Sequence, residues 1–107
     1  TADVEYWRSG YPVINADAPA AAAQKAVIAA LGEDNLIADL PPTTGGEDFA
    51  EMMQVVPGCF AFLGNDNTGS ERVAGLHTPD FDFNDDAIPY GVSYWINVVM
   101  QELGHPR

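Results

Sequence analysis

The chain has 107 residues, of which 47% are hydrophobic, and this is enough for one domain with a modest core. Sixteen acidic residues against four basic ones give a net charge of −12. That balance argues against binding to nucleic acid or to anionic membranes through a basic surface. No apolar run approaches the roughly 20 residues of a membrane span. We therefore predict a domain with neither nucleic-acid nor membrane partners.

The N-terminal third of the sequence predicts a strand, a helix and a second strand. Residues 4–13 are rich in Val, Tyr and Trp, which favour strands. An alanine-rich helix follows over residues 17–31, with Asp17 as its N-cap and Gly32 as its stop. Residues 36–40 form a short apolar run that ends at two prolines, which indicates a short strand.

The middle of the chain predicts a helix and a buried strand. Apolar residues recur at helical spacing over residues 47–56, and Glu47 and Asp48 stand at the N-terminus, where the helix dipole favours negative charge. Residues 59–63 are continuously apolar between two glycines, which is typical of a strand buried on both faces. The single cysteine, Cys59, begins this run. We predict a structural thiol there, and a reducing, cytoplasmic location.

One of only two histidines, His77, lies in the stretch Leu-His-Thr-Pro-Asp-Phe-Asp-Phe. The proline at position 79 favours an extended backbone before it, so His77 is predicted on a loop or strand-like segment. Four carboxylates follow, and a histidine among oxygen ligands suits a divalent ion such as zinc or manganese: Asp80, Asp82, Asp85 and Asp86. The spacing alone still favours an ordinary loop histidine.

The last predicted helix is capped by Asn84 or Asp85, has Pro89 just inside its start and ends at Gly104. It carries an apolar stripe that we predict to be core: Ile88, Val92, Trp95, Ile96, Val99 and Leu103. The second histidine, His105, lies in the C-terminal tail, where we expect no ligand role.

Three stretches together resemble a known family. They are Gly-Gly-Glu-Asp-Phe at residues 45–49, Val-Pro-Gly at 56–58 and the Leu-His-x-Pro-x-Phe stretch at 76–81. Their order and spacing resemble the C-terminal part of the metal-dependent amidohydrolases that include hippurate hydrolases, aminoacylases and auxin-conjugate hydrolases. The resemblance covers residues 4 to 103.

The resemblance implies an α/β fold, the C-terminal portion of a three-layer α/β/α zinc-peptidase-like catalytic domain. Residues 1–12 would then be the end of an inserted lid domain and its hinge strand. Residues 13–107 would be the C-terminal segment of the catalytic domain. A plain N-terminal edge strand is the alternative for residues 1–12.

The resemblance also implies a site. His77 would be one ligand of a centre with two divalent ions (Zn, Mn, Co or Ni), and Gly45, Gly46 and Glu47 would face the substrate. No catalytic residue is expected in this segment, because the family's general base and its other ligands belong to N-terminal motifs that this sequence lacks. A purely structural role at the helix N-terminus would also explain Glu47.

The function implied is cleavage of N-acyl amino acids, hippurate-like amides or related peptides. We expect this segment alone to be inactive, to require the N-terminal part of the same enzyme, and to belong to a homo-oligomer. The alternative is a non-catalytic acidic α/β interaction module, because exposed sheet edges and uncovered surfaces favour association.

Overall fold

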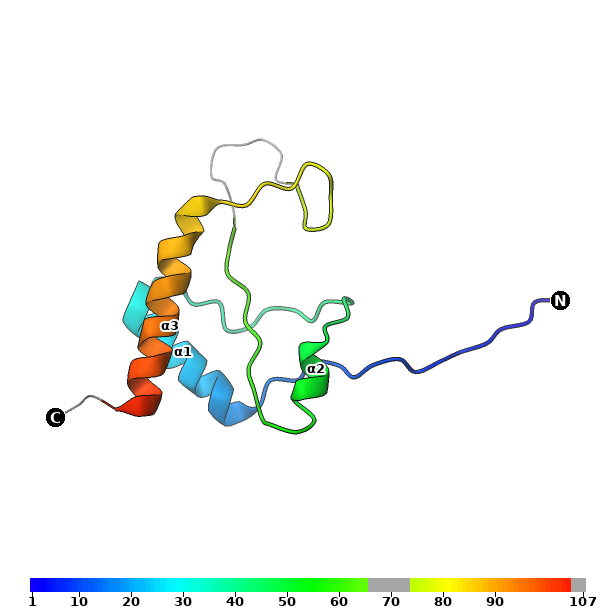
Figure 1. Cartoon of the computed structure of the whole chain (residues 1–107), viewed down its shortest axis with the longest axis horizontal. Coiled ribbons are helices and arrows are strands. Elements are labelled where there is room, and N and C mark those ends of the chain that lie inside the picture. The colour runs from blue at the N-terminus through cyan, green and yellow to red at the C-terminus, as the bar shows by residue number, and fades with distance from the viewer. Residues whose placement is uncertain (66–73, 105–107) are drawn as a thin grey trace.

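The structure is a computed structural model that describes residues 1–65 and 74–104. Its helices, in chain order, are α1 (Asp17–Leu31), η1 (Glu33–Asn35), α2 (Phe49–Met52), η2 (Asp85–Ala87) and α3 (Ile88–Leu103). The two long helices, α1 and α3, pack against each other, and the N-terminal segment runs away from them (Figure 1). Within the described ranges no helix is long and apolar enough to cross a membrane.

Helix α1 forms where the alanine-rich sequence predicts it. It begins at Asp17, with Ala16 as the N-cap, so Asp17 contributes its charge to the first turn and makes no side-chain cap. Gly32 ends the helix with φ 89° and ψ 157°, and its N–H donates to the Ile28 carbonyl at 3.0 Å. Only glycine adopts this backbone region readily, so the predicted stop is confirmed with its physical cause.

Helix α2 is shorter than the ten-residue helix predicted. After Met52 the chain continues in turns, with the N–H groups of both Val55 and Val56 donating to the Met52 carbonyl at 3.0 Å. Pro57 disfavours helical backbone at Val56, and two β-branched residues in succession weaken the helix further. The apolar periodicity therefore predicted a helix correctly, but α2 begins at Phe49 instead of Glu47 and ends at Met52 instead of Val56.

Helix α3 follows its predicted signals closely. The Asn84 side chain accepts a hydrogen bond from the Asp86 N–H at 3.0 Å and so caps η2, which leads directly into α3. Pro89 lies in the first turn, and Gly104 ends the helix with φ 72°. These local signals predicted both ends.

The segments predicted as strands, 4–13, 36–40 and 59–63, have no regular secondary structure, and no strand is assigned anywhere in residues 1–65 or 74–104. A strand exists only with a partner to share its backbone hydrogen bonds, and these segments lack such partners here. The burial predicted for 59–63 is also wrong in this chain, because Phe62 is 62% and Leu63 47% exposed. The helical part of the α/β prediction is thus confirmed, and its sheet is not formed.

The interior of the chain is small. Its buried hydrophobic residues among those described are three alanines, Ala26, Ala50 and Ala87. The radius of gyration is 17.5 Å, against about 13 Å for a compact domain of 100 residues. The stripe of α3 predicted as core faces outward, with Trp95 64% and Leu103 81% exposed. That prediction is wrong for this chain, because no other element of the described structure covers the stripe.

Candidate functional site

His77 lies at the surface in a tight turn. Its backbone φ is 65°, and among the described residues other than glycine it alone has a positive φ. Two hydrogen bonds close the turn: the Thr78 hydroxyl donates to the Gly75 carbonyl at 2.7 Å, and the Phe81 N–H donates to the Thr78 carbonyl at 3.2 Å. Histidine is among the residues enriched in this left-handed region. The loop prediction is confirmed, and the strand-like alternative is wrong.

The acidic residues after His77 do not gather around it. Asp80 and Asp82 are exposed, as are Asp85 and Asp86 at the start of η2. No group of three or more His, Cys, Asp or Glu side chains that could hold a metal ion occurs in residues 1–65 and 74–104. The donors of these described residues therefore do not make a metal centre by themselves, and among them His77 could supply one ligand of a larger set.

The Gly45–Glu47 segment is exposed and leads into α2. A Glu47 carboxylate oxygen, Oε1, accepts the Phe49 N–H at 3.3 Å, which satisfies one free donor of the first helical turn. Figure 1 shows this segment next to α2 and apart from the loop that carries His77. The structure thus gives Glu47 a helix-end contact and does not bring the two predicted site regions together.

Two asparagines make contacts that the sequence did not reveal. The Asn15 amide nitrogen donates to the Phe60 carbonyl at 2.9 Å, and the Phe60 N–H donates to Asn15 Oδ1 at 2.8 Å. Asn65 makes a similar pair of bonds to the backbone of residues 82–84. The one available signal was their position at the ends of extended runs, where an amide can replace a strand neighbour.

Cys59 is half-buried and close to Tyr94 of α3. Burial raises the pKa of the Cys59 thiol, so little thiolate is present near neutral pH. The pKa of Tyr94 is raised by burial and, to a smaller extent, by the charge of the Cys59 thiolate. These environments support the predicted structural role of Cys59, because a nucleophile needs the opposite shift.

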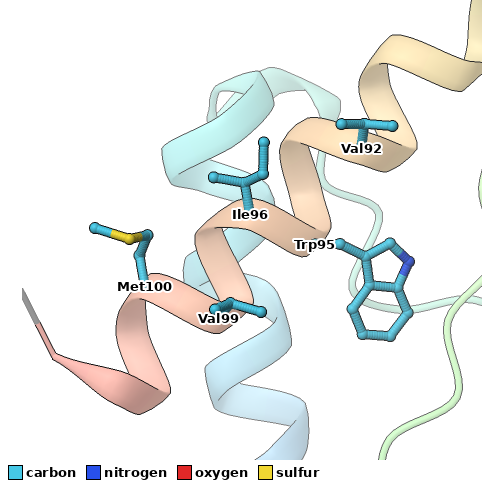
Figure 2. A pocket seen from close by; sticks show the side chains of 5 residues that line it. All are labelled: Val92, Trp95, Ile96, Val99 and Met100. Carbon is cyan, nitrogen blue, oxygen red and sulfur yellow. The ribbon is translucent and has the colours of Figure 1, made fainter.

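Two apolar grooves lie away from the predicted site. One, of about 360 Å³, lies on α3, and Figure 2 shows the side chains that line it, with α1 passing behind the helix: Val92, Trp95, Ile96, Val99 and Met100. The other, of about 530 Å³, is lined by α2 and the turns that follow it, from Phe49 to Gly58. Neither is lined by His77 or by Gly45–Glu47. They offer contact surface without chemically reactive groups.

The chain is similar in sequence to a known protein family over most of its length. The model of peptidase family M20/M25/M40 matches residues 1–101. The chain belongs to this family. Its match includes the 45–49, 56–58 and 76–81 stretches, and it confirms the resemblance to the metal-dependent amidohydrolases drawn from them.

Several curated relatives carry hydrolase names. The chain is 38% identical over 73 residues to the IAA-amino acid hydrolase ILR1-like 4 of Arabidopsis thaliana, covering 68% of this chain and 16% of the relative. It is 36% identical over 73 residues to ILR1-like 5 of the same plant, covering 68% and 17%. It is 33% identical over 97 residues to the uncharacterized hydrolase SH1513 of Staphylococcus haemolyticus, covering 88% and 24%.

The chain spans about a sixth of the length of the two plant relatives, with matches of 16% and 17% of those proteins. No solved structure matches it. The M20/M25/M40 assignment therefore rests on sequence, and the activity belongs to a longer polypeptide in those relatives.

Proposed function

We propose that the full-length protein carrying this chain is a metal-dependent amidohydrolase that cleaves N-acyl amino acids, hippurate-like amides or related peptides. The observation that carries the proposal is the family match over residues 1–101, which contains every stretch of the original resemblance. The names of the plant relatives, hydrolases of IAA-amino acids, support this substrate class.

In this proposal His77 is one ligand of a centre with two divalent ions (Zn, Mn, Co or Ni). Its exposed position on a hydrogen-bonded turn leaves the imidazole accessible to groups outside the chain. The remaining ligands and the general base belong to polypeptide beyond these residues, because the donors described here do not suffice for an ion. No step of the reaction is assigned to this chain.

Gly45, Gly46 and Glu47 are proposed to face the substrate. Neither glycine has a positive φ, and a Cβ at Gly46 would meet nothing within 4 Å. Neither backbone conformation nor packing within the described chain therefore requires glycine at these positions. Close approach of the backbone to a bound molecule would supply the reason.

The domain assignment is proposed on the same ground. Residues 1–12 would be the end of the lid domain and its hinge strand, and residues 13–107 the C-terminal segment of a three-layer α/β/α catalytic domain. In the full-length protein, further strands would cover the extended segments and the outward face of α3. A cytoplasmic location and homo-oligomeric assembly complete the proposal.

The test is to replace His77 by Asn and by Ala in the full-length protein. Asparagine tolerates the left-handed backbone, so His77→Asn removes the imidazole without the strain that His77→Ala adds. We expect both variants to lose bound metal in elemental analysis, and hydrolysis of N-acyl amino acids to fall at least 10–100-fold, the loss typical when a metal ligand's supporting contacts are removed.

The matched control is the same substitution at the other histidine, His105, which lies outside the described residues. His105→Asn is expected to keep both metal and turnover. A His77→Asn protein with its full metal content and normal turnover would contradict the ligand role of His77.

The alternative, a non-catalytic acidic α/β interaction module, is favoured by one observation, the outward apolar face of α3. It predicts a full-length protein that binds a partner and hydrolyses no member of a panel of N-acyl amino acids supplied with Zn, Mn, Co or Ni. Hydrolysis that depends on His77 excludes this alternative.

A further inference from the structure

Few backbone–backbone hydrogen bonds attach the segment 59–65 to distant parts of the described chain, although Phe60 packs against the Phe49 ring at 5.7 Å. One backbone–backbone hydrogen bond, from the Ala16 N–H to the Gly58 carbonyl at 3.0 Å, fixes the residue just before the segment begins. The Leu63 side chain lies against α3, since its Cδ2 would be 3.4 Å from a Cβ placed at Gly91. The other hydrogen bonds between this segment and distant parts of the described chain come from side-chain amides, at Asn15 and at Asn65.

Each amide acts as a substitute for a neighbouring strand. A primary amide carries a donor and an acceptor in one plane, as a peptide group does, so it can pair with backbone N–H and C=O groups together. Asn15 pairs in this way with Phe60. Asn65 accepts the Asn84 N–H at 2.8 Å and donates to the Asp82 carbonyl at 3.4 Å. The second bond is long, so the acceptor bond is the stronger one.

The backbone that Asn65 holds is continuous with the His77 turn. The turn closes at Phe81, whose N–H donates to the Thr78 carbonyl, and Asp82 follows it directly. On the C-terminal side of Asp82, the Asn84 side chain caps η2, the short helix that leads into α3. Asn65 therefore ties the connection between the turn and α3 to the end of segment 59–65.

We propose that Asn65 is a positioning residue for His77, fixing the place at which the His77 turn leaves the body of the domain. The proposal rests on the proposed function, in which His77 is a ligand. Through the Asp82–Asn84 backbone, the Asn65 amide would determine how often the imidazole lies where the rest of the site needs it. Asn15 holds the same segment at its far end, and its side-chain hydrogen bonds in the described chain go to Phe60 and not to that backbone.

The experiment compares Asn65→Ala, Asn65→Asp and Asn15→Ala in the full-length protein. Asn65→Ala removes both bonds, whereas Asn65→Asp keeps the acceptor for the Asn84 N–H. At one fixed pH, we expect Asn65→Ala to shift the NMR signals of the His77 imidazole and of the turn amides. We also expect it to lower kcat about 10-fold or more, the lower end of losses for groups that orient a ligand, with KM changed less than about twofold.

Asn65→Asp is expected to restore most of kcat and the original His77 signals. Asn15→Ala is the control for general destabilisation: it is expected to lower the melting temperature as Asn65→Ala does, with His77 signals and kcat unchanged. Equal effects of Asn15→Ala and Asn65→Ala on kcat would overturn the proposal and leave a merely structural role. So would unchanged His77 signals in Asn65→Ala.

These outcomes are distinct from failure of the proposed function. If His77→Asn retains full turnover, the ligand role fails, even where Asn65→Ala moves the His77 signals. If His77→Asn is inactive and Asn65→Ala behaves as the unchanged protein, the positioning proposal alone fails.

Discussion

The Asn15 side chain reaches the backbone of Phe60, a residue 45 positions further along the chain. Its two hydrogen bonds make up part of the pairing that a neighbouring strand would give to an extended segment. Such a contact depends on which distant segments the fold brings together. The sequence around one asparagine does not indicate which backbone groups its amide will reach. For that reason the sequence led us to predict a buried strand at 59–63 and no role for Asn15.

Removal of the Asn15 amide should loosen this segment. A net hydrogen bond contributes about 0.5–1.5 kcal/mol, so the loss of two bonds in Asn15→Ala is expected to lower local stability by about 1–3 kcal/mol. The Phe60 amide should then exchange its hydrogen faster, and Asn15→Asp, which keeps the acceptor, should preserve part of the protection. Asn35→Ala, which removes one local bond to the Leu31 carbonyl, is the control and should leave Phe60 unchanged. Equal Phe60 exchange in all variants would contradict the assignment.

Cys59 should react slowly with iodoacetamide at neutral pH. Because burial raises its pKa, the folded state holds the thiol proton more tightly than the unfolded state does. The contribution of Cys59 to stability is therefore present below the ordinary thiol pKa and is lost as pH rises through the folded-state pKa. Alkylation rates of folded and urea-unfolded protein, measured across pH, check this. A folded protein that reacts faster than the unfolded one at neutral pH would contradict it.

At the scale of the elements, local chemistry predicted the helices. Alanine content, a proline near the start and a glycine after the end placed α1 and α3, because these signals act within a few residues of the positions they mark. The length of α2 was mispredicted, because Pro57 and the β-branched pair before it disfavour helix at a position to which the apolar period still extends, and the chain turns after Met52. The strands did not form, because pairing is a property of two segments and not of one.

The glycine ends of the helices offer a direct test. Gly32→Ala places a side chain in a backbone region that is essentially glycine-only, and strain of this kind costs about 1–3 kcal/mol. We expect the midpoint of chemical denaturation, followed by circular dichroism, to fall accordingly. Gly10→Ala is the matched control, because a Cβ there meets nothing within 4 Å and Gly10 has no positive φ. A Gly32→Ala protein as stable as Gly10→Ala would exclude strain at this position.

At the candidate site, the sequence near His77 predicted part of the turn's geometry and not the rest. The proline at position 79 indicated a loop or a strand-like segment, but the left-handed φ of His77 depends on the bonds made by Thr78 and Phe81. The family resemblance identified His77 as a candidate ligand from its neighbours in sequence alone. Its partners in space could not be derived, since they do not gather in the described part of the chain.

At the scale of the whole molecule, the chain buries little of its apolar surface. Exposed apolar patches of this kind favour association, so the 107-residue chain on its own should be self-associated or marginally stable. Analytical ultracentrifugation and thermal denaturation test this. A monomer that melts cooperatively above about 65 °C, the upper end for ordinary domains, would contradict it.

The α3 face should drive that association. Trp95→Asn is expected to shift the sedimentation profile toward monomer, because it interrupts the uncharged groove of α3. The same substitution at Trp7, which is also exposed but lies in the N-terminal segment, is the control. Equal effects of the two substitutions would show that association does not depend on the α3 face.

The N-terminal segment has a consequence for proteolysis. Residues 1–12 are exposed and have no regular secondary structure, and they include Arg8, whereas the next basic residue, Lys25, lies within α1. A protease that cuts after basic residues needs an extended, accessible substrate, so trypsin should release residues 1–8 from the isolated chain before it cuts at Lys25. In the full-length protein, protection of Arg8 would show that other parts of the polypeptide cover this segment. Continued cleavage there would show that residues 1–12 act as an accessible connection.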